Sequence, residues 1–256
     1  RARREGDMSY CLATLIDDGI VFCSDSRTNA GPDRVGTYKK MHTFSAENER
    51  TLVLLVAGNL ATSQAVVARI KRDLREKAET NLYSLRYMTE VADYIGQLVL
   101  GETSKFIANE QRASAFDASV TFILGGQIRG QKQELYMIYP EGNHIKPSKA
   151  QPYLQIGETK YGKPILDRII RSDTPYETAM RCAVVSVDST MRSNVTVGPP
   201  IECLFYRKDS FAPHEQYFKL DESHPYLAAV RESWEENIRV AFEHLPSLDE
   251  VFKGCE

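Results

Sequence analysis

The chain has 256 residues and a formal net charge of −3, with 32 basic and 35 acidic residues mixed along its length. This balance gives no reason to expect nucleic acid or an anionic membrane surface as a partner. The longest apolar runs, such as residues 52–57, are far shorter than the roughly 20 residues of a membrane-spanning helix. No apolar signal segment precedes Met8, so we expect a cytoplasmic protein.

The cysteines and histidines show no metal-binding pattern. The five cysteines lie far apart and include no Cys-x-x-Cys pair. Four of them (Cys11, Cys23, Cys182 and Cys203) lie in apolar segments, which is typical of reduced core residues. The five histidines show neither a His-Glu-x-x-His motif nor any other paired spacing. The sequence therefore predicts no metal site and no cofactor.

Residues 1–8 differ in composition from the rest of the chain. They carry three arginines and no apolar pattern, and we interpret them as a leader, a tag or a propeptide. Removal of everything up to Met8 would leave Ser9 with a free α-amino group. Such a group titrates near pH ~8, far below a lysine. It can therefore act as the general base for the hydroxyl of its own residue.

A hairpin is predicted directly after this junction. Residues 9–16 and 20–23 are apolar runs, and Asp18-Gly19 between them is a strong signal for a tight hairpin turn. The first strand should begin at Ser9, and its antiparallel partner should end at Asp25. Antiparallel pairing then places Asp25 close to Ser9.

The remaining elements follow from apolar spacing and turn residues. Residues 28–38, rich in Gly, Pro, Asp and Asn, favour a loop. We expect further strands at 39–44, 51–57, 118–125, 134–139, 144–147, 153–157, 194–197 and 201–207. Helical spacing predicts helices at 60–77, 85–108, 161–171, 175–192 and 226–242.

The order of these elements is strands, two helices, strands, two helices, strands. Two stacked sheets with helices on both outer faces satisfy that order, which predicts a four-layer α/β/β/α sandwich. We expect one domain over residues 9–207, and a C-terminal helical extension over residues 208–256 that packs on the same domain.

The segment from Ser9 to Lys40 resembles the opening of a proteasome β-type subunit. These subunits belong to the N-terminal nucleophile hydrolases, which carry Thr, Ser or Cys at the start of the first strand of an α/β/β/α sandwich. Asp25 and Lys40 follow Ser9 by 16 and 31 residues, and both spacings fit the family to within a residue. Residues 24–31 and 156–164 are most similar to Anbu, the bacterial ancestral β-subunit type. The resemblance covers about residues 8–207.

The resemblance implies a catalytic set and a supporting set. Ser9 Oγ would be the nucleophile, Asp25 the orienting carboxylate, Lys40 an electrostatic activator and Gly58 a backbone donor in the oxyanion hole. The supporting residues would be Arg27, which holds the loop around Asp25, and Asp188 and Ser193, which orient the Ser9 amine. The pocket walls expected to bind substrate are Thr28, Ala30, Met41 and Asn59.

Residue patterns alone leave one assignment open. Strand alternation would put Lys39 on the same side as the apolar Met41 and Lys40 on the other side. The sequence does not decide which side faces the site, so the choice of Lys40 rests on the resemblance. The chain also departs from the family, because its nucleophile position is serine instead of the usual threonine. Gly157-Glu158 stands where the family has a serine-glycine pair.

The resemblance implies a peptidase that cleaves peptides or unfolded proteins inside a homo-oligomer, as a ring, a stacked ring or an open helical or lock-washer assembly. No motif requires an ATPase partner. The alternatives are a catalytically silent assembly subunit and an amidase that acts on a small amide, since fold does not fix function. If residues 1–8 stay attached, the amine base is missing and the chain is a scaffold or a zymogen.

Overall fold

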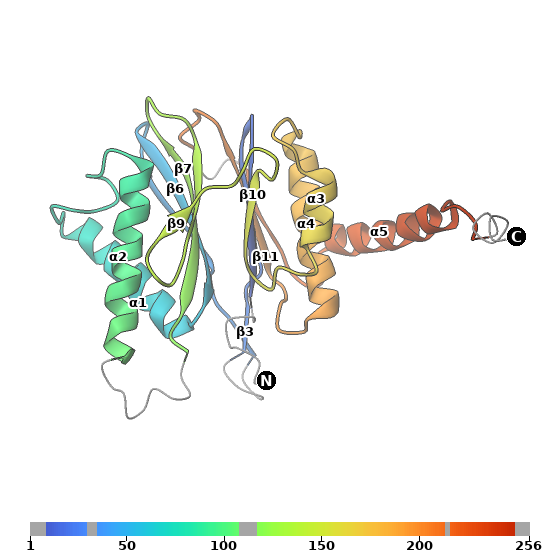
Figure 1. Ribbon diagram of the computed structural model, residues 1–256, viewed down its shortest axis with the longest axis horizontal. Helices are drawn as coiled ribbons and strands as arrows, with labels where there is room; N and C mark the ends of the chain where they lie inside the picture. Colours follow the sequence, from blue (N-terminus) through green and yellow to red (C-terminus); the bar gives the residue numbers. More distant parts are fainter. Residues whose placement is uncertain (1–8, 30–34, 108–116, 213–215, 249–256) are drawn as a thin grey trace, which may run out of the picture.

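Two antiparallel sheets lie face to face in this computed structural model, with helices on both outer sides (Figure 1). The structure describes residues 9–29, 35–107, 117–212 and 216–248. Within these ranges each large sheet has five strands, in the orders β10-β1-β2-β11-β12 and β5-β6-β7-β8-β9. The predicted four-layer α/β/β/α sandwich is therefore confirmed.

The first sheet is built from strands at both ends of the domain. Its members are β1 (Tyr10–Ile16), β2 (Gly19–Ser24), β10 (Tyr153–Gly157), β11 (Ile201–Arg207) and β12 (Tyr217–Leu220). The second sheet contains β5 (Met41–Ala46), β6 (Arg50–Gly58), β7 (Val120–Ile128), β8 (Glu134–Ile138) and β9 (His144–Ile145). A small hairpin of β3 (Arg27–Asn29) and β4 (Val35–Thr37) occupies part of the expected loop 28–38.

The helices form the two outer layers and one projection. The helices α1 (Leu60–Arg75) and α2 (Met88–Ile107) cover the second sheet, and α3 (Lys163–Ile169) and α4 (Tyr176–Ser193) cover the first (Figure 1). The last helix, α5 (Pro225–Glu243), extends away from the body. None of the described helices is both long and apolar enough to cross a membrane.

Strand alternation in β1 explains the layers. Tyr10, Leu12 and Ile16 pack toward α3 and α4, whereas Cys11 and Ala13 pack into the core between the two sheets. All five side chains are buried. The first strand is therefore apolar on both faces, as a strand between two packed layers must be.

The predicted hairpin forms with a definite register. β1 and β2 pair from Cys11 opposite Ser24 to Ile16 opposite Gly19, and Asp17 and Asp18 make the turn. Ser9 therefore directly precedes β1, and Asp25 directly follows β2 at the same end of the sheet. This is the geometry that the sequence predicts.

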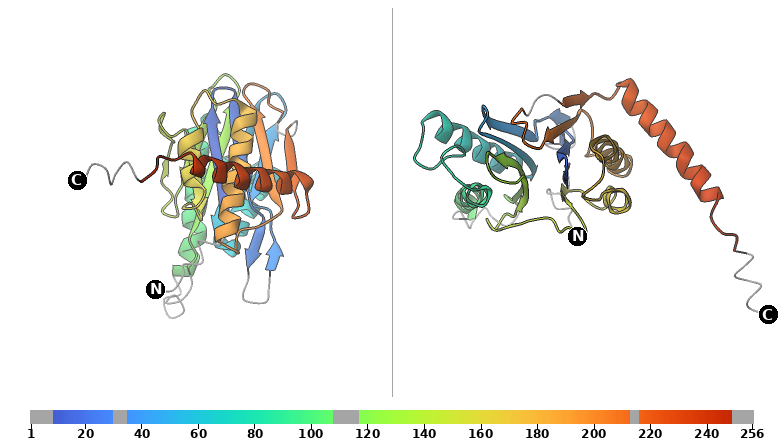
Figure 2. Two further views of the ribbon diagram at one scale, coloured as in Figure 1. Left: turned by 90° about the vertical axis from the view of Figure 1, so that its right-hand side faces the viewer. Right: turned by 90° about the horizontal axis from the view of Figure 1, so that it is seen from above.

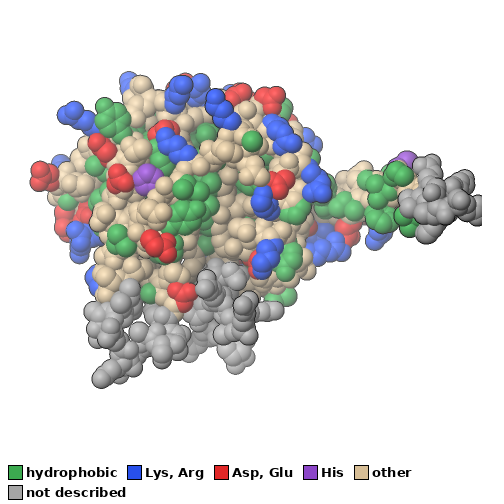
Figure 3. All heavy atoms as spheres, in the orientation of Figure 1, with side chains coloured by type: hydrophobic (Ala, Val, Ile, Leu, Met, Phe, Trp, Pro, Cys, Tyr) green, Lys and Arg blue, Asp and Glu red, His purple; other side chains and the backbone are tan. Residues whose placement is uncertain are grey.

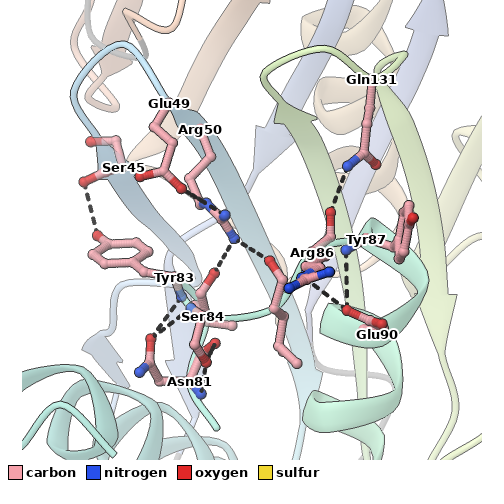
Figure 4. Close-up of polar contacts among 12 residues, drawn as sticks. Ser45, Glu49, Arg50, Asn81, Tyr83, Ser84, Arg86, Tyr87, Glu90 and Gln131 are labelled. Atoms are coloured by element: carbon pink, nitrogen blue, oxygen red, sulfur yellow. Dashed lines mark hydrogen bonds and ion pairs between the residues drawn. The ribbon is translucent and has the colours of Figure 1, made fainter. Parts of the chain in front are cut away.

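The start of β6 is tied to the loop between α1 and α2. Arg50 is 5% exposed, and its Nη1 donates to the carbonyls of Leu82 and Leu85 at 2.9 and 2.7 Å (Figure 4). Glu49 Oε1 accepts from Nη2 of Arg50 at 2.7 Å. A buried guanidinium is tolerated only when its donors are satisfied, so these bonds fix the loop against the sheet.

One expected strand is absent from the structure. Residues 194–197 form no strand, because Asn194 caps the end of α4 and its Oδ1 accepts from the backbone and hydroxyl of Thr196. That predicted strand is wrong. The C-terminal extension packs on the domain only in part, since β12 joins the first sheet while most of α5 is exposed (Figure 2).

Candidate active site

The end of β10 holds the backbone of Ser9. Ser9 is 8% exposed, and its carbonyl accepts a hydrogen bond from the Glu158 N–H at 2.8 Å. Gly157 has φ of 82°, and a Cβ added there would lie 1.9 Å from the Ser9 carbonyl oxygen. Only glycine allows both the backbone conformation and this close approach. Gly157 therefore allows the end of β10 to pack closely against the Ser9 backbone at one end of the first sheet.

Asp25 is fully buried beside the first strand. Its Oδ1 accepts from the Tyr10 N–H at 2.9 Å and its Oδ2 from the Gly198 N–H at 3.2 Å. The Asp25 N–H donates in turn to the Tyr10 carbonyl at 3.1 Å. The carboxylate is thus bonded to the residue next to Ser9, which is the proximity that the hairpin predicts.

Lys40 completes the pair. Its Nζ lies 2.7 Å from Asp25 Oδ1 and donates to the Arg27 carbonyl at 2.6 Å, and only 5% of the residue is exposed. Lys39 is exposed. Strand alternation could not decide between these lysines because β5 begins only at Met41, so both preceding residues lie outside the pleat.

Burial and charge oppose each other at this pair. Removal of the carboxylate from water raises the pKa of Asp25. The Lys40 ammonium and the N–H groups of Tyr10 and Gly198 oppose that rise, because each stabilises the ionised form. A buried charge pair needs such additional hydrogen bonds to be tolerated.

Gly58 ends β6 close to these groups. The neighbouring Val56 N–H donates to the Lys40 carbonyl at 3.1 Å. Gly58 itself has φ of 115°, and a Cβ there would lie 2.6 Å from the Ser119 carbonyl oxygen. The Asn59 side chain accepts from the Thr62 N–H at 3.1 Å and so caps α1. The chain therefore turns sharply from β6 into α1 at Gly58.

Arg27 contacts the loop that precedes β11. Its Nη1 donates to the Val195 carbonyl at 2.9 Å. The backbone N–H groups of Ser26 and Arg27 both donate to the Gly198 carbonyl at 3.2 Å. A Cβ at Gly198 would come within 2.3 Å of the Arg27 guanidinium carbon. Sequence reasoning missed Gly198, whose signal is a glycine directly before two prolines.

The two residues expected to support the Ser9 amine, Asp188 and Ser193, both lie in α4. Asp188 accepts from Arg231 of α5, through Nε at 2.9 Å and Nη2 at 2.7 Å. Ser193 is exposed at the end of α4. The side chain that reaches the Ser9 side of the site from this helix end is Asn194, whose Nδ2 donates to Glu158 Oε2 at 3.2 Å. Glu158 and Asn194 carry no sequence motif that would have identified them.

The expected pocket walls are placed only in part. Met41 is 1% exposed and packs in the core between the sheets, so it fills that core instead of lining a pocket. Asn59 caps α1 and also donates to the Asp117 carbonyl at 3.0 Å. Thr28 lies in β3, and Ala30 lies outside the described residues.

The arrangement brings the Ser9 backbone, the Asp25 carboxylate and the Lys40 ammonium to one end of the sandwich, where β6 also ends at Gly58. Among the described residues, no group of three or more His, Cys, Asp and Glu side chains could hold a metal ion. The chemistry that these groups can support is nucleophilic attack by Ser9 Oγ, provided that a base takes its proton.

Comparison with known proteins gives a family. The model of the proteasome subunit family matches residues 9–205. Anbu (ancestral β-subunit) from Yersinia bercovieri is 43% identical, with a TM-score of 0.86, and the match covers 93% of this chain and 98% of that one. Anbu from Hyphomicrobium sp. strain MC1 is 38% identical, with a TM-score of 0.85 and the same shares covered.

A further solved structure is described as the helical assembly of the Anbu complex from Pseudomonas aeruginosa. It is 41% identical, with a TM-score of 0.87, and the match covers 93% of this chain and 97% of that one. No curated protein matches the chain. The family model and these structures agree over the whole sandwich, and the chain belongs to the proteasome subunit family, within which it is similar to the bacterial Anbu proteins.

Proposed function

We propose that the chain is an N-terminal nucleophile peptidase whose nucleophile is Ser9. The observation that carries this proposal is the convergence of Asp25 and Lys40 beside Ser9, with Lys40 Nζ 2.7 Å from Asp25 Oδ1 and the Tyr10 N–H 2.9 Å from the same oxygen. A buried lysine and aspartate at one strand end are costly unless they serve as a pair. Their position next to a hydroxyl that can become N-terminal supports a catalytic use.

The reaction proceeds in two steps. Ser9 Oγ attacks the scissile carbonyl carbon while the free α-amino group takes the hydroxyl proton, directly or through a water molecule. Collapse of the tetrahedral intermediate breaks the C–N bond, the proton passes to the leaving amine, and an acyl ester remains on Ser9. Water then attacks the ester with the same amine as base and releases the second product.

The surrounding groups stabilise charge during these steps. The Lys40 ammonium favours the developing alkoxide of Ser9, and Asp25 holds that ammonium in place. The Gly58 N–H donates to the oxyanion, and loss of such a donor typically costs on the order of 10²–10³ in rate. Arg27 keeps the 195–198 loop against the Asp25 segment through its bond to the Val195 carbonyl.

We further propose that the protein works in the cytoplasm as a homo-oligomer on peptides or unfolded proteins. The relative from Pseudomonas aeruginosa forms a helical assembly. In this chain the apolar stripe of α5 begins on the chain's own core with Leu227 and Val230 and continues along the projecting part of the helix. There Ile238 is 47% exposed and Phe242 is 73% exposed. Hydrophobic side chains are visible on the projecting part of the molecule in Figure 3. Exposed apolar surface of this kind marks an interaction site.

Two other functions differ from this one, the first in the state of Ser9 and the second in the substrate. A chain that keeps residues 1–8 lacks the amine base and acts as an assembly subunit or a zymogen. An amidase of the same superfamily would use the same site on a small amide. The groups around Ser9 are compatible with the peptidase, the assembly subunit or zymogen, and the amidase. A chemical test is therefore needed to separate these functions.

The test is the intact mass of the purified protein before and after treatment with a peptide epoxyketone, which captures an adjacent amine and hydroxyl. We expect protein expressed from Met8 to have a mass that begins at Ser9 and to gain one stoichiometric adduct. Ser9→Ala should lose the adduct. A Ser9-terminal protein that gains none contradicts the peptidase proposal. Turnover of small amides but not of peptides would favour the amidase.

A further inference from the structure

Glu158 stands opposite the proposed nucleophile. The register of β1 and β10 pairs Tyr10 with Gly157, so the next antiparallel pair is Ser9 with Glu158. One hydrogen bond continues past the ends of both strands, because the Glu158 N–H donates to the Ser9 carbonyl at 2.8 Å. Glu158 is thus an acidic residue directly across from Ser9.

The carboxylate of Glu158 is buried and held in place. The residue is 6% exposed, and its Oε2 accepts from Asn194 Nδ2 at 3.2 Å. The Asn194 amide has a fixed orientation, since its Oδ1 accepts from Thr196 N at 3.0 Å and Thr196 Oγ1 at 2.7 Å. The neutral amide of Asn194 therefore presents its N–H group to Glu158.

The charges around Glu158 leave its own charge incompletely balanced. Lys160 Nζ lies 3.4 Å from Glu158 Oε1, but the Lys160 side chain is 71% exposed, so water screens it. From the neighbouring elements, Lys40 pairs with Asp25, and Asp188 of α4 pairs with Arg231 of α5.

Arg27 is also engaged elsewhere, since its guanidinium donates to the Val195 carbonyl. A buried carboxylate such as that of Glu158 is costly without a buried cation. A cation on the opposite residue would offset this cost.

We propose that the Glu158 carboxylate, held by Asn194, orients the freed α-amino group of Ser9 and strengthens it as the base. Glu158 is a positioning residue, and the inference rests on the proposed use of Ser9 as an N-terminal nucleophile. A nearby negative charge stabilises the protonated amine and so raises its pKa, whereas the Lys40 ammonium lowers it. The two residues together set the pH at which the amine is free to accept a proton.

The first test titrates the amine without relying on activity. Protein expressed from Met8, with a mass that begins at Ser9, is acetylated with acetic anhydride across a pH series, and the N-terminal peptide is quantified by mass spectrometry. Glu158→Gln keeps the volume and the bond to Asn194 but removes the charge. We expect the pKa of the Ser9 amine to fall by about half a unit or more. Glu158→Asp, whose shorter side chain draws the charge back, should give a smaller fall.

The matched control is Glu134→Gln. Glu134 lies at the other end of the sandwich and pairs with Lys146 and Tyr136. It should leave the amine pKa unchanged. An unchanged or raised amine pKa in Glu158→Gln would overturn the inference. An equal fall of that pKa in Glu158→Gln and in the control Glu134→Gln would also overturn it.

The second test follows the reaction of the same proteins with the epoxyketone at several pH values. In Glu158→Gln we expect the pH midpoint of the inactivation rate to move down with the amine, while the constant for initial inhibitor binding stays the same. A shift confined to inhibitor binding would overturn the positioning role. If the wild type forms no adduct, the peptidase proposal fails, and the amine titration alone still decides on Glu158.

Discussion

The Lys40 ammonium lies 2.7 Å from Asp25 Oδ1, and both residues are removed from solvent. This contact joins the end of β2 to the segment that leads into β5, and so links the two sheets at one end of the sandwich. The same carboxylate oxygen also accepts from the Tyr10 N–H. The ion pair and the residue after Ser9 therefore form one bonded unit.

Replacement of Lys40 by Met should be costly for both stability and reaction. The Asp25 carboxylate would stay buried without its cation, so we expect the free energy of unfolding to fall by about 3 kcal/mol and the Ser9 adduct to disappear. The double variant Asp25→Asn with Lys40→Met should recover much of the stability but none of the reactivity. Urea unfolding at one fixed protein concentration measures the first effect, and intact mass measures the second.

The exposed neighbour supplies the control for that prediction. Lys39→Met should leave the unfolding free energy and the adduct yield as in the wild type. A Lys40→Met protein of unchanged stability would contradict the buried pair.

Gly58→Ala should lower the rate of Ser9 acylation by about 10²–10³. The added Cβ would lie 2.6 Å from the Ser119 carbonyl at a φ of 115°, so the backbone must move and carry its N–H with it. Gly130→Ala is the matched control, because Gly130 also has a positive φ, of 80°, but its Cβ would meet nothing within 4 Å. Gly130→Ala should react at the wild-type rate, because it adds backbone strain without moving the Gly58 N–H. Equal rates in both would show that the Gly58 N–H has no part in the reaction.

His42 in β5 should make the fold sensitive to acid. Burial, with nearby Lys71 and Lys39, lowers the pKa of His42 from 6.5 to about 4. Between these values the unfolded chain binds a proton that the folded chain does not. The contribution of neutral His42 to the free energy of unfolding is therefore complete above about pH 6.5 and is lost as the pH falls toward 4. The loss is at most about 3 kcal/mol.

The measurement is urea unfolding at pH 7 and pH 4.5 for the wild type and His42→Gln. The wild type should lose more stability than the variant over this interval. Parallel losses in the two proteins would mean that His42 keeps its ordinary titration in the fold.

Charges on the α5 stripe should break the proposed assembly. We expect Ile238→Glu and Phe242→Glu, each placed on the exposed part of the helix, to lower the mass of the particle in analytical ultracentrifugation. The circular dichroism of the sandwich should not change, because both residues lie beyond the packed start of α5. Tyr87→Glu is the control, since Tyr87 is 56% exposed elsewhere on the surface. A particle mass that falls equally in the control would assign the effect to charge alone.

Local signals were sufficient for the part of the site that one hairpin creates. The Asp18-Gly19 turn fixes the register of β1 and β2, and that register alone places Asp25 beside Ser9. The layers also follow from the sequence, because strands that are apolar on both faces require cover on both sides. The choice between Lys39 and Lys40 did not follow, since the strand pattern begins one residue later.

Contacts between distant segments explain the remaining differences. The structure gives Asp188 a partner that the sequence did not predict, because Arg231 lies 43 residues away on a helix whose direction the sequence does not specify. Residues 194–197 have the composition of a strand, yet the bonds of the Asn194 side chain to Thr196 turn the chain instead. Met41 is apolar in either role, and only the packing of the second sheet against the first places it in the core.

The projecting helix acts as a lever. Its 19 residues span about 28 Å at 1.5 Å per residue, and the ion pairs Arg231–Asp188 and Arg192–Glu235 hold it at two positions near its middle. The end of the helix lies about 18 Å beyond Arg231, so a rotation of about 10° there would move it by about 3 Å. In an assembly held through α5, the angle between successive copies would therefore depend on the ion pairs Arg231–Asp188 and Arg192–Glu235.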